Sequence, residues 1–290
     1  MKKKRALILV NKLARQGEAD LDAVRRVLED GGIDSVVHAF DAIDRIEEAV
    51  RRHRQHIDCV IVGGGDGTLN AALESILDSK LPLGVLPMGT ANDLARTLEI
   101  PFAPEDAAGV IVRGRIARID LGWVNGKHYL NVAHIGLAAK VSHTLTTEMK
   151  KRWSVLAYPL ALIDAYRTNR PFKARVTCDG QTQNLKSIQI AIGNGRHYGG
   201  GMSVRHDAVI DDRQLNFYSL EPQSIWHLLW SAPAIVRGTF TRGDLVRLMN
   251  GKEIEVTTSR TMRVDTDGEL VTRTPAVFRV KEGALPIFVP

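Results

Sequence analysis

Short apolar runs alternate with helical patterns over the first 120 residues, and this alternation constrains the fold more than any other feature of the chain. Strands are expected at 6–10, 35–40, 59–62 and 83–86, and helices at 17–30, 42–54, 69–77 and 90–98. Strands that alternate with helices predict a parallel sheet covered on both faces, which is a three-layer α/β domain. Ligands bind such sheets at the carboxyl ends of the strands.

The pattern changes near residue 115, where strand-like runs separated by turn residues begin. These runs are 117–124, 128–136, 172–180, 187–194, 214–220, 253–258, 261–270 and 276–283. They predict a second, mostly antiparallel domain of β-sandwich type. Helical stretches are expected at 147–168 and 223–238. We therefore predict an α/β domain over 1–122, completed by 281–290, and a β-rich domain over 123–280.

Charge, cysteine pattern and apolar run lengths exclude several classes of protein, but they do not identify a binding partner. The net charge of +6 and the pI near 9.4 favour acidic partners such as nucleotides, anionic lipid or nucleic acid, and a solvated basic surface explains them equally well. Cys59 and Cys178 lie outside any CxxC pattern, so neither a zinc site nor a disulfide framework is expected. The apolar run 6–10 is too short for a signal peptide, and no run approaches a membrane span. A cytoplasmic protein with peripheral membrane contact at most is expected.

The stretch CVIVGGGDGTLN (59–70) places glycines between a strand and a helix. Adjacent glycines let backbone N–H groups approach an anion, and the helix N-terminus favours negative charge. A phosphate could therefore lie over Gly63–Thr68, while the alternative is a tight packing turn. The stretch lacks the lysine of a Walker A loop and the third glycine of a Rossmann fingerprint.

Asp66 is the unusual residue of this loop, because a carboxylate would repel phosphate directly. It fits if it reaches Mg²⁺ bridged to phosphate, or if it caps the helix, and the loop alone does not separate these readings. A second loop, LPMGTANDLA (86–95), opens another helix at the same sheet edge. Thr90 can contact a phosphate or ribose oxygen, and Asn92 and Asp93 can bind a ribose or cap the helix.

VGGGDGTLN followed by LPMGTANDLAR resembles the catalytic-domain family of diacylglycerol, sphingosine and ceramide kinases, and most closely its soluble bacterial branch. The resemblance covers essentially the whole chain. Its further marks are RIDLGWVNGKHYLNVAHIG, GNGRHYGGG, HDAVIDDRQL and DTDGEL. The GGDGT core alone is shared with NAD kinases and, more distantly, with phosphofructokinases.

The resemblance implies roles for individual residues. The nucleotide would be held by Asn11, Gly64, Gly65, Asp66, Gly67, Thr68, Asn70, Thr90, Asn92 and Asp93, with Asp66 essential. Asp267 would serve the catalytic Mg²⁺, and Glu269 would be the general base for the lipid hydroxyl. Without the resemblance, the Asp267-Gly268 pair reads as an ordinary hairpin turn.

The resemblance also implies a structural Mg²⁺ in HDAVIDDRQL, held by the Asp212 side chain and the carbonyls of Val209 and Gln214. Here the chain departs from the family, because Arg213 stands where a glycine is usual. A positive φ at that position would disfavour a side chain. The chain departs elsewhere too, with Lys12 after Asn11 in place of proline and Ala71 in place of a glutamate.

The expected activity is ATP-dependent, Mg²⁺-dependent phosphorylation of a hydroxyl on diacylglycerol or a related lipid. The alternatives are an NAD kinase or other small-molecule kinase, and a non-catalytic relative that binds nucleotide or lipid. Contact with an anionic membrane is expected, and a candidate patch for it is formed by Lys150, Lys151, Arg152 and Trp153, which a solvated helix end would explain equally well. Nucleic acid is disfavoured because no aromatic-interleaved basic stripe occurs, and formation of a homodimer is left open.

Overall fold

The computed structural model describes residues 3–11, 18–40, 44–137, 170–194, 197–198, 202–203, 210–222 and 246–290. They fall into two compact units. The N-unit is made of the described residues up to Leu121, of 197–198 and of 281–290, and the C-unit is made of the rest. The helices expected at 147–168 and 223–238 lie outside the described residues.

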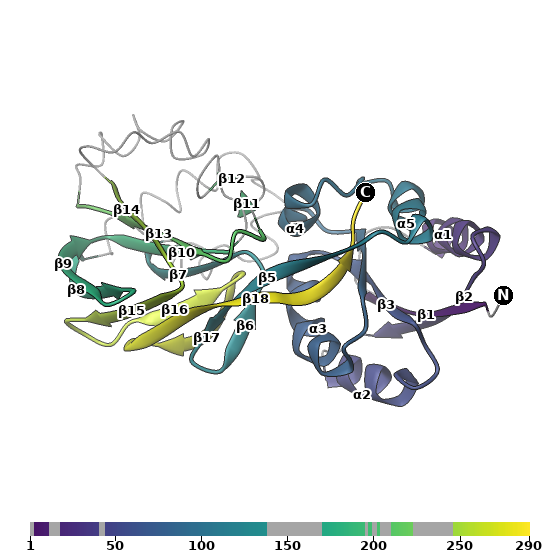
Figure 1. The fold of residues 1–290 in the computed structure, drawn as a ribbon, viewed down its shortest axis with the longest axis horizontal. Coiled ribbons are helices and arrows are strands. Elements are labelled where there is room, and N and C mark those ends of the chain that lie inside the picture. The colour runs from purple at the N-terminus through teal and green to yellow at the C-terminus, as the bar shows by residue number, and fades with distance from the viewer. Residues whose placement is uncertain are drawn as a thin grey trace. The chain divides into compact units, whose positions relative to one another are not determined.

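A parallel sheet forms the middle layer of the N-unit (Figure 1). Its order is β2-β1-β3-β4-β18, and every neighbouring pair is parallel. The strands are β1 (Lys4–Asn11), β2 (Ile33–Phe40), β3 (Cys59–Gly64), β4 (Leu83–Pro87) and the end of β18 (Ala276–Phe288). β3 and β4 are buried along their whole length, as expected of continuous apolar runs covered on both faces.

Helices cover both faces of this sheet, which confirms the predicted three-layer fold. They are α1 (Glu18–Asp30), α2 (Asp44–His53), α3 (Asp66–Ser79), α4 (Asp93–Thr97) and α5 (Pro104–Arg113). α1 packs with α5 on one face, and α2 packs with α3 on the other (Figure 1). In the part of the chain that is described, no helix combines the length and apolar character needed to cross a membrane.

Two helices differ from the sequence prediction. α5 was not predicted, although Pro104 opens it and Gly114 ends it in the left-handed conformation (φ 73°). It packs closely on β4, because a Cβ built on Gly84 would lie 2.7 Å from Ile111 Cδ1. α4 was expected to begin at Thr90 and begins at Asp93, since Asn92 adopts a left-handed φ of 51° that no helix can include.

Two antiparallel sheets form the C-unit, which confirms the predicted β-sandwich. One has the order β14-β13-β10-β7-β16-β17, and the other runs through β18-β15-β8-β9. Their strands are β7 (Val132–Gly136), β8 (Phe172–Cys178), β9 (Gln181–Ser187), β10 (Gln189–Gly193), β13 (Leu215–Leu220), β14 (Val246–Gly251), β15 (Glu253–Thr258), β16 (Arg263–Thr266) and β17 (Glu269–Arg273). The remaining strands are β5 (Ile116–Val124), β6 (Lys127–Tyr129), β11 (His197–Tyr198) and β12 (Met202–Ser203).

Alternate side chains of these strands form the core of the C-unit. Phe172, Val176, Ile190, Phe217 and Phe278 belong to one buried cluster. The sequence did not predict β9, because QTQNLKS has no apolar alternation. β9 ends its sheet and pairs only with β8 among the described strands, so most of its side chains remain exposed and need not be apolar.

Candidate functional site

The two glycine-rich loops of the N-unit touch through their main chains. β3 and β4 are parallel neighbours, with Gly64 opposite Pro87, so both loops leave the sheet at the same edge. Met88 N–H donates to the Gly64 carbonyl at 3.0 Å. A Cβ built on Gly89 would lie 2.4 Å from Gly65 Cα, closer than real Cβ contacts come. The two segments that the sequence predicted as nucleotide loops therefore lie in direct contact in the structure.

Asn92 closes the second loop on itself. Its Oδ1 accepts the Gly89 N–H at 3.0 Å, and its Nδ2 donates to the Gly89 carbonyl at 3.0 Å. The residue is only 8% exposed, and its side chain does not cap α4. The left-handed backbone suits asparagine, which tolerates αL better than most residues. Asn92 thus shapes the loop through its side chain.

Asp66 occupies the first position of α3 and does not cap that helix. Its Oδ1 accepts the N–H of Leu94, in the first turn of α4, at 3.3 Å. Asp93 is buried beside it at 4% exposure. Burial first, and then the negative charge of Asp93, raise the pKa of Asp66. The ionised form of Asp66 is therefore less favourable here than it would be in water, and a nearby cation would stabilise that form.

The other residues predicted to bind nucleotide lie on or near these loops. Gly67 and Thr90 are exposed, while Asn11, Thr68 and Asn70 are half-buried. Gly64 is buried against Thr68, because a Cβ built on Gly64 would lie 2.6 Å from Thr68 Cβ. Residues 12–17, which follow Asn11, lie outside the described residues.

The close approach at Gly89 gives a first prediction. Gly89→Ala should lower the free energy of unfolding by about 1–3 kcal/mol, because the new methyl must push the loops apart. It should also weaken ATP binding. Gly67→Ala is the matched stability control, since a Cβ there meets nothing within 4 Å, and a gain of up to about 1 kcal/mol is expected in a helix. Urea denaturation measures the free energy of unfolding of both variants. Equal stability of Gly89→Ala and Gly67→Ala would contradict the close approach of the two loops.

In the C-unit, Asp267 and Gly268 form the tip of the hairpin between β16 and β17. Both have positive φ, 48° and 92°, and Thr266 pairs with Glu269. This is the geometry of a two-residue hairpin turn of the primed type. The Asp267 carboxylate accepts backbone N–H groups from Leu130 at 2.8 Å, Asn131 at 3.0 Å and Val132 at 3.1 Å.

Glu269 begins β17 directly after this turn. Its side chain is exposed, and no hydrogen bond or ion pair to it occurs among the described residues. A carboxylate that is held at one end of a strand and left open to solvent can accept a proton from an incoming hydroxyl.

The groups that hold the connector between β6 and β7 were not predicted from the sequence. Asn194 N–H donates to the Asn131 carbonyl at 2.8 Å, and Asn194 Nδ2 donates to the Leu130 carbonyl at 2.9 Å. The N–H groups on the same connector donate to Asp267. The main-chain donors have no residue-type signature, while Asn194 lies in the GNGRHYGGG stretch, to which no role was given.

A buried polar cluster behind the hairpin was also missed. His134 on β7 lies opposite Asp265 on β16, and its Nδ1 is 3.0 Å from Gln189 Nε2. Burial lowers the pKa of His134 to about 4, so it is neutral at physiological pH. In the sequence these residues resembled ordinary positions of three strands.

At the Asp212 loop, the backbone has the left-handed conformation that a side chain at position 213 was expected to disfavour. Arg213 adopts a φ of 60°, so this chain keeps a left-handed backbone without the family's usual glycine. Asp212 Oδ1 accepts the Gln214 N–H at 3.0 Å. Val209 lies outside the described residues. Within the described ranges, no group of three or more His, Cys, Asp or Glu side chains is arranged to hold a metal ion.

The left-handed Arg213 gives a second prediction. Arg213→Gly should raise the free energy of unfolding by up to about 1 kcal/mol, since glycine adopts this φ without steric cost. Arg213→Ala is the control, because it also removes the side chain but keeps a Cβ. A urea midpoint for the glycine variant at or below that of the alanine variant would contradict a strained backbone.

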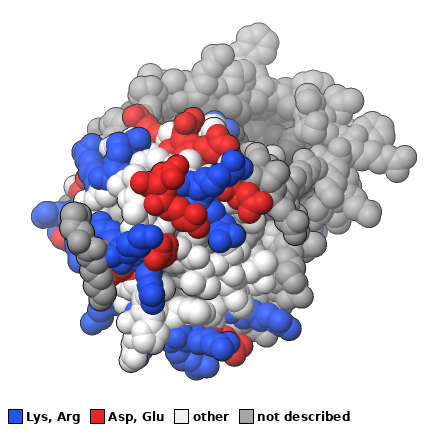
Figure 2. All heavy atoms as spheres, turned by 90° about the vertical axis from the view of Figure 1, so that its right-hand side faces the viewer, with Lys and Arg blue, Asp and Glu red and all other residues white. Residues whose placement is uncertain are grey.

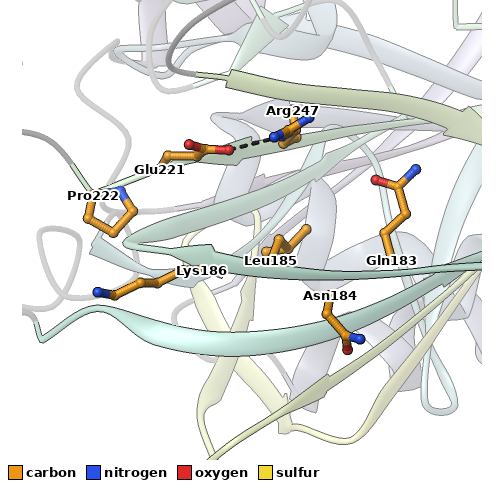
Figure 3. Close-up of a pocket in the computed structure, with 7 residues that line it drawn as sticks. All are labelled: Gln183, Asn184, Leu185, Lys186, Glu221, Pro222 and Arg247. Carbon is orange, nitrogen blue, oxygen red and sulfur yellow. Dashed lines mark hydrogen bonds and ion pairs between the residues drawn. The ribbon is translucent and has the colours of Figure 1, made fainter.

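A pocket of about 660 Å³ lies in the C-unit away from the DG turn (Figure 3). Its walls are Gln183, Asn184, Leu185, Lys186, Glu221, Pro222 and Arg247. Arg247 Nε and Glu221 Oε1 form an ion pair of 2.9 Å across it. None of the predicted site residues lines this pocket, so it has no part in the candidate site.

The surface charge of the N-unit is mixed on the face that Figure 2 presents. Lys and Arg side chains lie among Asp and Glu side chains there (Figure 2). Among the ion pairs of the N-unit are Lys3–Asp34 and Arg25–Glu29. This face therefore has no uniform positive field, and the net charge alone does not make it a membrane-binding surface.

Comparison with known proteins agrees with this architecture. The family model of the diacylglycerol kinase catalytic domain matches residues 5–124, and that of the YegS C-terminal NAD kinase beta sandwich-like domain matches residues 131–289. A protein of Staphylococcus saprophyticus named diacylglycerol kinase is 27% identical over 99% of this chain and 96% of its own length. One of Staphylococcus aureus (strain bovine RF122 / ET3-1) with the same name is 27% identical over 99% and 93%.

Solved structures show the same fold. A crystal structure of a diacylglycerol kinase from Bacillus anthracis str. Sterne has a TM-score of 0.81 at 22% identity and covers 100% of this chain and 98% of that one. A second crystal structure from that organism has a TM-score of 0.85 at 25% identity and covers 100% and 96%. The chain therefore belongs to the diacylglycerol kinase catalytic-domain family and carries the YegS-type C-terminal β-sandwich domain.

Proposed function

We propose that this protein is an ATP-dependent lipid kinase that transfers the γ-phosphoryl group to a hydroxyl of diacylglycerol or a related lipid. The observation that carries the proposal is the contact between the glycine loops at Gly65 and Gly89, with the acidic pair Asp66 and Asp93 beside it. The relatives named diacylglycerol kinase support the same class of reaction.

The nucleotide phosphates would lie over the first loop. α3 spans Asp66–Ser79, and the first backbone N–H groups of a helix have no intrahelical partner and favour an anion. Gly64, Gly65 and Gly67 allow close approach of the main chain. The hydroxyls and amides of Asn11, Thr68, Asn70 and Thr90 would hold the ribose and phosphates, while Asn92 would shape the loop.

Magnesium fits beside Asp66 and Asp93. The charge of Asp93 adds to the cost of ionising Asp66, and Mg²⁺ prefers carboxylate oxygens together with substrate phosphates. When bound, Mg²⁺ would neutralise the charge that develops on the phosphates during transfer. Asp66 would thus serve the metal, while the Leu94 N–H keeps its carboxylate in place.

Glu269 would be the general base. Its carboxylate would take the proton of the lipid hydroxyl as that oxygen attacks the γ-phosphorus, while the bond from the γ-phosphorus to the bridging oxygen breaks and ADP leaves. The β-rich C-unit would then bind the lipid acceptor.

We further propose a structural Mg²⁺ at Asp212, Val209 and Gln214. We also propose a cytoplasmic protein that contacts anionic membrane peripherally and can form a homodimer. The candidate patch at 150–153 lies outside the described residues.

One assay tests the function and its main competitor together. The purified protein is incubated with ATP and Mg²⁺ and, in separate reactions, with diacylglycerol, monoacylglycerol, ceramide, sphingosine or NAD, and ADP is measured. We expect ADP release with a lipid and none above background with NAD. Release with NAD alone would assign the site to an NAD kinase, and no release with any acceptor would favour a non-catalytic relative.

A further inference from the structure

The hairpin tip at Asp267 is fixed to the connector before β7 by both its main chain and its side chain. Its carboxylate accepts the N–H groups of Leu130, Asn131 and Val132 at 2.8–3.1 Å. In return, Asp267 N–H donates to the Val132 carbonyl at 3.0 Å. Oδ1 alone accepts two of these donors. The side chain of Asp267 therefore holds the connector to the hairpin tip without any ligand.

The same arrangement occurs at two other hairpin tips of the C-unit. Asp179 has a φ of 45° and precedes Gly180, its Oδ1 accepts the Glu253 N–H at 2.9 Å, and its own N–H donates to the Glu253 carbonyl at 3.0 Å. Asn125 also has a φ of 45°, its Oδ1 accepts the Val277 N–H at 3.0 Å, and its own N–H donates back at 3.4 Å. Each tip residue exchanges two hydrogen bonds with one residue of a neighbouring strand.

The Asn125 tip shows that this motif needs no negative charge, because an amide oxygen performs the same task there. Asp179 makes these contacts with a carboxylate, although it is not one of the predicted site residues. A carboxylate in this motif therefore need not belong to a reaction site. The hydrogen bonds of Asp267 are thus those of a recurring way of docking a two-residue hairpin turn on the adjacent strand. Asp267 therefore makes the same structural contacts as Asn125 and Asp179, which hold their turns on a neighbouring strand.

We propose that Asp267 is a positioning residue, which docks the turn and thereby directs Glu269, and that it is not a ligand of the catalytic metal. The inference rests on the proposed function of Glu269 as the base. Three N–H groups present the positive ends of their dipoles to this carboxylate and use both lone pairs of Oδ1 and one of Oδ2, so at most one of its four lone-pair sites is left for a metal. Because Glu269 is the first residue after the tip, a shift of the turn moves the base directly.

Two substitutions at one position separate the roles. Asp267→Asn keeps an oxygen for the Oδ1 bonds, as Asn125 does, and removes the charge, while Asp267→Ala removes every side-chain bond. Positioning predicts that the alanine variant loses about 100-fold in kcat through misplacement of the base, that the asparagine variant retains most activity, and that neither changes the Mg²⁺ requirement. A metal ligand predicts equal losses in both variants and an Mg²⁺ requirement raised by about 10–100-fold.

Amide hydrogen exchange without Mg²⁺ or nucleotide supplies a readout that does not depend on activity. We expect faster exchange at Leu130, Asn131 and Val132 in the alanine variant, and mainly at Leu130 in the asparagine variant, because only the Oδ2 bond is lost there. Asp179→Ala is the matched control, with faster exchange at 252–253 and unchanged kcat.

The outcomes distinguish this inference from the proposed function. If the unmodified protein phosphorylates no acceptor, the proposed function fails, while the exchange rates still show whether Asp267 holds the connector. Unchanged exchange at 130–132 in Asp267→Ala, or a raised Mg²⁺ requirement in Asp267→Asn, would overturn the positioning role.

Discussion

Glu269→Gln should abolish lipid phosphorylation while leaving Mg-ATP binding intact. The glutamine keeps the size of the side chain and removes its ability to accept a proton, and a general base contributes about 10²–10⁴-fold to rate. Glu269 is exposed at the start of β17, so the change should not affect folding. Steady-state kinetics measures the loss in kcat, and calorimetric titration with Mg-ATP measures the binding.

The matched control is Glu255→Gln. Glu255 is another exposed glutamate of the C-unit, on β15, so its substitution makes the same change in charge away from the proposed base. It should leave kcat unchanged. Wild-type turnover in Glu269→Gln would remove Glu269 from the role of base.

Asp66→Asn should weaken Mg-ATP binding by about 10–100-fold, as expected for loss of a group that serves a metal. The asparagine can still accept the Leu94 N–H, so a residue that only caps α4 would show no such loss. The variant should be at least as stable as the unmodified protein. The pKa of Asp66 is raised by burial and by Asp93, so its ionised form costs stability at pH values above that pKa, and asparagine removes the cost.

Asp78→Asn is the control for this substitution. Asp78 lies on the same helix and is exposed, so the change in net charge is equal. Titration with ATP in the presence and absence of Mg²⁺ should show a difference only for Asp66→Asn. Normal Mg-ATP affinity in Asp66→Asn would reduce Asp66 to a cap of α4.

The sequence predicted the place of the two glycine loops because that place follows from local pattern and sheet geometry. Continuous apolar runs indicated buried parallel strands, and parallel strands end at a common edge, so Gly65 and Gly89 were expected near each other. The contact between their main chains was not predictable, since it depends on how two crossovers pack. Nor was the partner of Asp66, because Leu94 lies 28 residues further along the chain.

The elements that escaped prediction are those fixed by tertiary contacts. The expected helix begins only after Asn92, whose side chain bonds to Gly89, and local propensity does not contain that information. β9 is polar because it ends its sheet. Arg213 adopts a left-handed φ although the sequence argued against one there. At the DG turn, the sequence indicated a hairpin, while the main-chain donors of 130–132 became visible only in the fold.

Transfer of the γ-phosphoryl group to a lipid hydroxyl is the central claim, and mass spectrometry of the lipid tests it most directly. The protein is incubated with Mg²⁺, diacylglycerol in mixed micelles and ATP that carries heavy oxygen in its γ-phosphate. We predict a lipid phosphate that contains the heavy oxygens, and none with Glu269→Gln. Unmodified lipid in both reactions, or equal labelling in both, would contradict the account.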